Sequence, residues 1–176
     1  MDASVVINCS EDRHVFATIA SIDEDVEVIV SLTPDAMIQD LLENLGVKYV
    51  VSPKGNQAFT TNKGIAAATN DKVILIDSDC CFAPGAIRRF YTALDRYSVV
   101  NGFVKFESTA TKLSKAIADC RSFDNSYDAP LYKPGLGIKK AIVDQISGFY
   151  FNQLAPWTDD ADFSFRVKAA GIATHS

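Results

Sequence analysis

Asp77 and Asp79 are the residues of this sequence whose type and spacing best suit chemistry. They follow the apolar run at residues 73–76, with Ser78 between them. Two carboxylates at this spacing supply hard oxygen ligands for Mg²⁺ or Mn²⁺, and a bound dication can bridge from them to a diphosphate. Because acidic side chains alone would repel a diphosphate, the metal would also reverse the local charge. The alternative interpretation of the pair is a solvated turn that caps a helix.

An α/β pattern over about the first hundred residues is expected to position this pair. Short apolar runs alternate with amphipathic helical patterns, which is typical of a mostly parallel sheet flanked by helices. Strands are expected at residues 5–7, 26–30, 48–51 and 73–76, with a mixed strand near 99–106. Helices are expected at residues 13–22, from Thr33-Pro34 to Gly46, through 66–68 and from Pro84. Ligands bind outside the carboxyl ends of such strands, so the acidic pair should point into the site.

The alternation of strands and helices stops after residue 106. Helical spacing of apolar residues predicts a helix that includes Leu113, Ala116, Ile117 and Cys120. Residues 132–137 are expected to form a loop, and residues 160–170 a last helix that Gly171 ends. We therefore expect one domain, residues 1–176, in which residues 1–106 form the first half and residues 107–176 a part that shapes the site.

Composition narrows the classes of function. The chain has 176 residues, 48% of them hydrophobic, which suffices for one compact domain. A net charge of −5 and the lack of a Lys or Arg run argue against nucleic-acid binding. No apolar stretch approaches the roughly 20 residues of a transmembrane helix. We expect a soluble, cytoplasmic domain, with attachment to a membrane surface left open. The cysteines lack metal-site spacing and are expected to be reduced: Cys9, Cys80, Cys81 and Cys120.

Several segments, taken in order, resemble family 2 glycosyltransferases. The N-terminal ones are SVVIN at 4–8, VEVIVS at 26–31, PKGNQAFTTNKGIAAAT at 53–69 and VILIDSDCCFAPGAI at 73–87. Downstream, residues 146–149 resemble the glycine-phenylalanine segment of the family, and residues 157–166 its acidic catalytic motif. The resemblance covers nearly the whole chain. It implies the α/β GT-A fold: a Rossmann-like, mostly parallel sheet flanked by helices, with a nucleotide-sugar-binding half and a smaller C-terminal acceptor-side part.

The resemblance implies an inverting glycosyltransferase. The donor would be a nucleoside diphosphate sugar, with a UDP-sugar expected first, and the acceptor a hydroxyl of a carbohydrate or a lipid-linked molecule. Asp77 and Asp79 would contact Mn²⁺ or Mg²⁺ and the diphosphate. Asp160 would be the general base, since inverting transfer needs one carboxylate to take the hydroxyl proton. Asp159 and Asp162 compete for that role, and stabilisation of a helix N-terminus explains the same cluster without chemistry.

Donor contacts are expected at nine residues, which include the acidic pair. They are Asn8, Ser31, Asp35, Lys54, Asn62, Gly64, Asp77, Ser78 and Asp79. Gly64 would cost its helix about 1 kcal/mol unless something approaches that backbone closely. The second strand lacks the aspartates with which the family holds the base. Ser31 or Asp35 would have to replace that acceptor, so the base need not be uracil.

Three further residues have a functional interpretation, and two of them, Lys63 and Trp157, have an ordinary one as well. Lys63, like Lys54, could meet a phosphate or be an exposed lysine beside a turn. Trp157 could stack on a sugar ring or pack in the core or at its rim. His175 lies where some relatives place a histidine near the metal.

Two other classes of function stay open. A noncatalytic module that binds a nucleotide or a partner would explain the altered base-binding strand, although Asp77, Asp79 and Asp160 together argue against it. A sugar nucleotidyltransferase would need a basic, glycine-rich N-terminal loop, whereas residues 8–12 are acidic. The chain is also expected to be compatible with a fragment of a longer enzyme.

Overall fold

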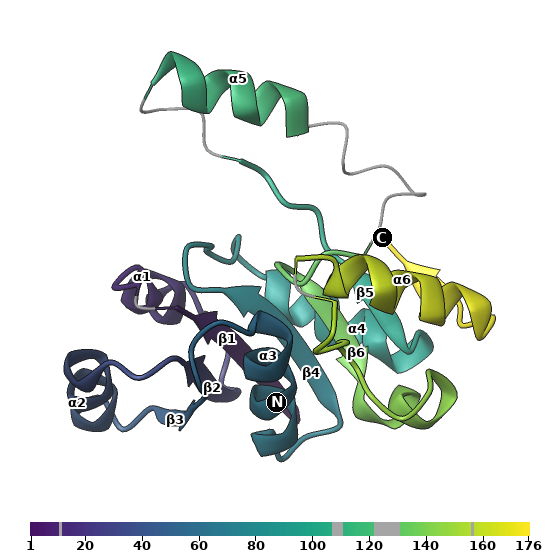
Figure 1. Cartoon of the computed structure of the whole chain (residues 1–176), viewed down its shortest axis with the longest axis horizontal. Coiled ribbons are helices and arrows are strands. Elements are labelled where there is room, and N and C mark those ends of the chain that lie inside the picture. Colours follow the sequence, from purple (N-terminus) through teal and green to yellow (C-terminus); the bar gives the residue numbers. More distant parts are fainter. Residues whose placement is uncertain (11, 107–110, 122–130, 156) are drawn as a thin grey trace.

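The computed structural model describes residues 1–10, 12–106, 111–121, 131–155 and 157–176 (Figure 1). Within these residues, seven strands form a mixed sheet in the order β3-β2-β1-β4-β6-β5-β7. The strands are β1 (Ala3–Cys9), β2 (Glu27–Leu32), β3 (Lys48–Val51), β4 (Lys72–Asp77), β5 (Val99–Asn101), β6 (Leu136–Lys139) and β7 (Thr174–His175). The helices are α1 (Val15–Ala20), α2 (Ala36–Asn44), α3 (Gln57–Ala67), α4 (Ala86–Arg96), α5 (Lys112–Arg121), the 3₁₀ helix η2 (Lys140–Gln145) and α6 (Asp159–Ala169).

Strands β3, β2, β1 and β4 are parallel, as the sequence predicts. After β1 the chain continues to β2 on one side, whereas β4 lies on its other side. The strand order therefore reverses between β1 and β4, and such switch points are where ligands bind in open α/β sheets. At this point Asn8 of β1 lies between Ser31 of β2 and Asp77 of β4 in the register.

The side chains of the central strands alternate between two hydrophobic layers. One layer contains Val6, Val73 and Leu75 and is covered by α3 and α6. The other contains Val5 and Ile7 and is covered by α1, α2 and α4. Because both faces of the sheet are buried, these strands are continuous apolar runs in the sequence. The result is the three-layer α/β architecture that the sequence predicts (Figure 1).

The predicted loop at residues 132–137 is wrong at its C-terminal end, because β6 begins at Leu136. This strand runs antiparallel to both β4 and β5 and separates them. Gly137, which favoured a loop, is instead a site of close packing. A Cβ atom there would lie 2.9 Å from Cδ1 of Phe90 on α4. The glycine therefore lets α4 approach the sheet.

One helix boundary and one strand boundary also differ from the sequence prediction. Asp35, and not Thr33, is the N-cap of α2, and its carboxylate accepts a hydrogen bond from the Ile38 amide at 3.1 Å. The strand predicted near residues 99–106 ends at Asn101. Both differences are boundary shifts that leave the order of elements intact.

Helix α5 stands apart from the body of the domain (Figure 1). Its apolar residues Leu113 and Ile117 are exposed. The helix itself was predicted from their spacing. Among the described residues, no helix is both long and apolar enough to span a bilayer. All four cysteines are free thiols, as expected.

Candidate functional site

A cavity of about 460 Å³ opens at the carboxyl ends of β1, β2 and β4. This size falls within the usual range for small-molecule sites. Its lining comes from the loops after these strands, the start of α3 and the turn before α6. The lining residues are Asn8, Cys9, Ser10, Asp12, Thr33, Gly55, Asn56, Gln57, Ala58, Thr60, Asp77, Ser78, Asp79, Trp157 and Asp159.

The Asp77–Asp79 turn lies at one wall of the cavity and is fixed from two directions. Asn8 donates from Nδ2 to Oδ1 of Asp77 at 3.3 Å, and the amide of Ser78 donates to the carbonyl of Asn8 at 2.9 Å. On the other side, the buried hydroxyl of Thr18 lies 2.7 Å from the carbonyl oxygens of both Ser78 and Cys80. Burial raises the pKa of Asp77, and the hydrogen bond from Asn8 opposes that effect.

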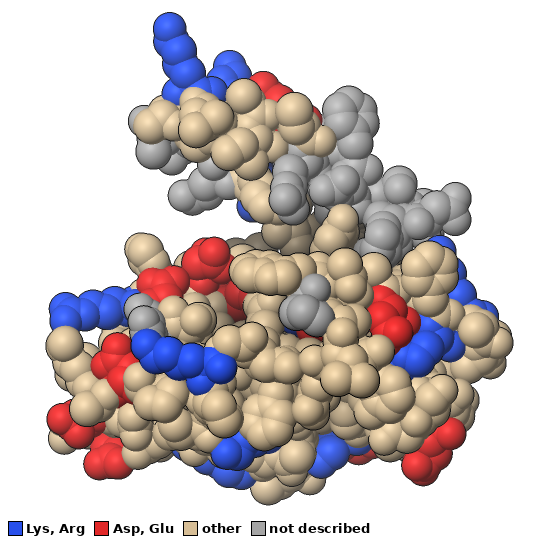
Figure 2. Space-filling view, viewed as in Figure 1, with Lys and Arg blue, Asp and Glu red and all other residues tan. Residues whose placement is uncertain are grey.

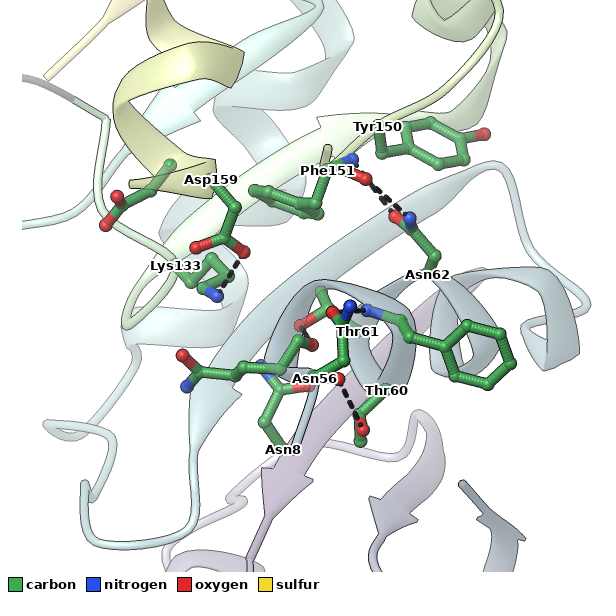
Figure 3. A network of polar contacts seen from close by, with 12 residues as sticks. Asn8, Asn56, Thr60, Thr61, Asn62, Lys133, Tyr150, Phe151 and Asp159 are labelled. Atoms are coloured by element: carbon green, nitrogen blue, oxygen red, sulfur yellow. Dashed lines mark hydrogen bonds and ion pairs between the residues drawn. The ribbon is translucent and has the colours of Figure 1, made fainter. Parts of the chain in front are cut away.

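The turn before α6 brings a second set of carboxylates to the cavity. Asp159 lines the cavity and is almost completely buried, yet it does not cap the helix. Its Oδ2 lies 2.6 Å from Nζ of Lys133, and both side chains are 4% exposed (Figure 3). Asp159, Asp160 and Asp162 all lie in the first turn of α6, as stabilisation of a helix N-terminus requires, and Asp159 in addition forms this buried ion pair.

The three acidic residues of this cluster have different partners. Asp159 is paired with Lys133, and Asp162 accepts from Nε of Arg166 at 2.8 Å, one helical turn along α6. Asp160 forms no ion pair within the described residues. Burial raises its pKa, and a hydrogen bond from the Ala161 amide at 2.9 Å opposes the rise. Asp160 does not itself line the cavity but directly follows Asp159, which does.

The segment that leads to this turn is held against α3 and α6. Asn62 of α3 makes two hydrogen bonds with the backbone of Phe151, one from its Nδ2 at 2.7 Å and one to its Oδ1 at 3.0 Å (Figure 3). Asn56 donates to the carbonyl of Gln153 at 2.9 Å. From the other side, Arg166 donates to three carbonyl groups, those of residues 146, 149 and 150. These contacts position the acidic turn across the cavity from β4.

Several predicted donor contacts lie outside the cavity lining. Ser31 is buried and donates to the carbonyl of Thr60 at 2.6 Å. Asp35 caps α2. Gly64 faces the sheet, where an added Cβ would lie 2.5 Å from Cγ1 of Val6, so the close approach that its helix requires is that of β1. Asn62 binds the Phe151 backbone, and Lys54 is likewise absent from the lining. Asn8, Asp77, Ser78 and Asp79 do line the cavity.

Lys63 and His175 contact other parts of the fold and do not line the cavity. Lys63 donates to the carbonyl of Val51 at the end of β3. The His175 ring stacks on Tyr97, with 4.7 Å between ring centroids, and it belongs to β7 at the sheet edge. Trp157 does line the cavity, is 93% exposed and has a positive φ of 69°. It is therefore a surface residue at the cavity rim.

Two residues that matter to this site were missed by the sequence analysis. Thr33 lines the cavity, and its buried hydroxyl has no hydrogen-bond partner within the described residues. Oδ1 of Asn8 is likewise buried and has no hydrogen-bond partner among the described residues. Lys133 carries the buried charge opposite Asp159. Thr33 could have been found, because it directly follows β2, where the sequence lacks the aspartate of the family. No local pattern in the sequence indicates Lys133.

The cavity is acidic, and its lining contains four aspartates but neither Lys nor Arg among the described residues. Acidic side chains also gather on the surface of the body below α5 (Figure 2). No cluster of three or more His, Cys, Asp or Glu side chains suited to a metal occurs in the described part of the chain. Mg²⁺, however, is commonly bound by one or two carboxylates together with substrate phosphates. Asp77 and Asp79 fit that donor set.

The protein is an α/β domain with a mostly parallel sheet and an acidic cavity at its switch point, the place where open α/β sheets bind ligands. The chain belongs to glycosyl transferase family 2: the model of that family matches residues 13–135. The fold is accordingly the GT-A fold expected from the sequence. Among curated protein sequences, none matches the chain.

Solved structures agree with this fold. The chain is similar to a mannosyltransferase, PcManGT from Pyrobaculum calidifontis, in complex with GDP-Man and Mn²⁺, with a TM-score of 0.69 and 14% identity over 99% of this chain and 54% of that one. It is also similar to S. aureus TarS 1-349 in complex with UDP-GlcNAc, with a TM-score of 0.67 and 14% identity over 97% of this chain and 54% of that one. Glucosyl-3-phosphoglycerate synthase from Mycobacterium tuberculosis, in complex with UDP, has a TM-score of 0.58 and 18% identity over 82% of this chain and 58% of that one. The chain thus spans about half the length of these proteins.

Proposed function

We propose that this domain transfers a sugar, with inversion, from a nucleoside diphosphate sugar to a hydroxyl acceptor. Asp77 and Asp79 hold a divalent metal and the donor diphosphate, and Asp160 is the general base. The observation that carries the proposal is the position of the Asp77–Asp79 turn. It lies at the switch point of a family 2 fold, across one cavity from the acidic turn that begins α6.

The charge of the cavity supports a role for Mn²⁺ or Mg²⁺. The lining is acidic, so a diphosphate would be repelled unless a cation is present. When bound at Asp77 and Asp79, the metal would stabilise the negative charge that develops on the departing diphosphate. Complexes of relatives with GDP-Man and Mn²⁺, with UDP-GlcNAc and with UDP are consistent with this type of donor.

Two buried polar atoms without hydrogen-bond partners favour binding of a nucleoside in the same cavity. Oδ1 of Asn8 and Oγ1 of Thr33 are buried without a partner among the described residues, and both residues line the cavity. Such atoms cost about 1–3 kcal/mol each unless a ligand or water satisfies them. We expect the nucleoside to bind here. Thr33, which lines the cavity, would contact the base in place of Ser31 and Asp35, which do not line it.

The partners of the acidic cluster support Asp160 as the base. Asp159 and Asp162 are each held by a cation, whereas Asp160 is not. Burial raises the pKa of Asp160, which makes its carboxylate a better proton acceptor than an exposed aspartate. The acceptor hydroxyl would approach beside Trp157, whose exposed ring at the rim can stack on a sugar.

The proposal is tested by a thermal-shift titration with UDP, GDP, CDP and ADP, each with and without Mn²⁺ or Mg²⁺. A ligand that binds only the folded state raises its stability by mass action, by about 2.7 kcal/mol at 100 times its Kd. We expect one diphosphate to stabilise the domain only when the metal is present, and Asp79→Ala to abolish the shift. The same mixtures, supplied with the matching sugar nucleotide, are assayed for release of the diphosphate.

Two outcomes would contradict the proposal. If no nucleotide shifts the melting temperature at millimolar concentration, the site does not bind a donor. If a nucleotide binds but no sugar is released to water or to any hydroxyl acceptor, the domain is a noncatalytic nucleotide-binding module. The nucleotidyltransferase alternative is disfavoured because the cavity wall after β1 consists of Asn8, Cys9, Ser10 and Asp12, in place of a basic loop.

A further inference from the structure

Lys133 is a buried cation beside the reaction centre that the proposed function leaves without a role. It precedes β6, and its ammonium group lies 2.6 Å from the carboxylate of Asp159, with both side chains 4% exposed. The same ammonium group lies 5.4 Å from the ring centroid of Phe151 (Figure 3). Lys133 and Asp159 are 26 residues apart in the sequence. The pair therefore connects the segment before β6 to the turn that begins α6.

A buried ion pair is a costly way to stabilise a fold. Removal of two charges from water costs several kcal/mol per ion, and apolar side chains of similar volume are often at least as stabilising. Asp159 could have capped α6 at the surface with no buried lysine. The position of Lys133 is therefore better explained by what its charge does to the neighbouring carboxylates than by stability.

The carboxylates around this lysine are close enough to influence each other. At Asp160, beyond the effect of its own burial, the charge of Asp159 raises the pKa and the charge of Lys133 lowers it. Asp77, across the cavity on β4, is affected by the same two residues in the same directions. On α6 itself, Asp162 is already neutralised by Arg166. Without Lys133, Asp159 and Asp160 would be adjacent uncompensated charges.

We propose that Lys133 is a positioning residue for the general base: by neutralising Asp159 and fixing its carboxylate, it holds Asp160 ionised and oriented at the acceptor side. This inference rests on the proposed function. Lys133 is assigned no contact with the substrate, because its side chain is 4% exposed and its ammonium group is already paired with Asp159.

The test compares Lys133→Met, Lys133→Arg and the neutral pair Lys133→Met/Asp159→Asn with the unmodified domain. The kcat and KM of sugar transfer are measured as a function of pH, together with the melting temperature. In Lys133→Met, the acid limb of kcat should move up by about 1 pH unit or more, because an opposite charge has been removed and a like charge left unpaired. The donor KM should change less than kcat. The neutral pair should return the limb toward its original pH, and Lys133→Arg should keep it.

Two results would overturn the inference. One is an acid limb that stays in place in Lys133→Met while the melting temperature falls, which would leave Lys133 a structural role only. The other is a limb that the neutral pair fails to restore. If Lys133→Met does not fold, Asp159→Asn decides instead: it leaves the charge of Lys133 uncompensated, so the acid limb should move to lower pH, and a limb that stays in place would overturn the inference.

A second readout separates this inference from the proposed function. The side-chain carboxyl of Asp160 is followed by NMR in a pH titration, which needs no activity. A titration midpoint that rises in Lys133→Met and returns in the neutral pair supports the coupling even in a domain that transfers nothing. Transfer by the unmodified domain with unchanged Asp160 midpoints in the variants would sustain the proposed function and refute the role of Lys133.

Discussion

At the scale of single residues, the acidic cluster shows how carboxylates that look alike in the sequence acquire different chemistry. Asp159, Asp160 and Asp162 lie within four residues of one another, and any of them could have been the base. Their environments distinguish them, since Lys133 holds the first and Arg166 the last. A carboxylate already held by a cation is a weaker proton acceptor, because the cation stabilises its ionised form.

Asp160→Asn should therefore reduce kcat strongly while it leaves the fold intact. Loss of a general base typically lowers the rate by about 10²–10⁴-fold. Donor binding, measured by thermal shift with diphosphate and metal, should persist. The matched control is Asp144→Asn, an exposed carboxylate on η2. Transfer that survives Asp160→Asn at the unmodified rate would exclude Asp160 as the base.

The pH dependence of the unmodified domain follows from the same residue. Burial is the main reason that the pKa of Asp160 is above its ordinary value. Because the base must be ionised, kcat should fall as the pH drops through that raised pKa, and thus at a higher pH than for an exposed aspartate. A pH–rate profile that stays flat down to about pH 4, the ordinary range of an aspartate, would contradict this assignment.

At the scale of elements, α3 connects the two halves of the site. Its N-cap residue Asn56 and its central residue Asn62 bind the backbone of residues 151 and 153, which lead to the acidic turn. Its opposite side presses on the sheet at Gly64, next to Val6 and Ser31. Gly64 thus allows α3 to lie close to β1. A substitution that moves α3 away from the sheet would also move the acidic turn, which Asn56 and Asn62 hold.

Gly64→Ala tests this packing because two effects oppose each other. Helix propensity alone would stabilise the domain by up to about 1 kcal/mol. The added Cβ, however, would lie 2.5 Å from Cγ1 of Val6 and 3.0 Å from Cβ of Ser31. Overpacking of this kind costs about 1–3 kcal/mol, so we expect a net loss of stability in urea unfolding. Ala66→Gly, at an exposed position of the same helix, is the control and should cost about 1 kcal/mol. A stabilised Gly64→Ala variant would show that the sheet yields.

The sequence predicted the elements whose signals are local and missed those that depend on distant partners. The parallel strands were predictable because burial on both faces requires apolar runs, and Asp77 followed from its place after one of them. β6 was missed because Gly137 is explained by Phe90 and Leu94, which lie on another element, α4. Lys133 was missed for the same reason, since its partner Asp159 is 26 residues away. Gly64 was correctly expected to permit a close approach, but what approaches is β1.

At the scale of the whole molecule, the candidate site and a network of stabilising hydrogen bonds lie at opposite ends of the parallel strands. The cavity lies at the carboxyl ends of the strands, whereas Glu27 lies at the amino end of β2 and joins several elements there. It accepts hydrogen bonds from Ser4 of β1 at 2.5 Å, from Lys48 of β3 at 3.0 Å, and from the amide of Thr69, which follows α3, at 2.8 Å. Substitutions at this network should change the free energy of unfolding without a direct effect on the donor.

Glu27→Gln should therefore destabilise the domain in a pH-dependent way. Burial raises the pKa of Glu27, but the hydrogen bonds from Ser4, Thr69 and Lys48 outweigh it and lower the pKa to about 2, from 4.5. A depressed pKa stabilises the fold above the unfolded value of 4.5, and this contribution is lost as the pH falls from there toward 2. In urea unfolding at pH 7, the variant should lose about 1.5–3 kcal/mol, the usual value of a hydrogen bond to a charged group. The difference from the unmodified domain should shrink as the pH is lowered from 4.5 to 3, while the nucleotide-induced thermal shift at pH 7 stays the same. A difference that is constant with pH would mean that the charge of Glu27 does not contribute.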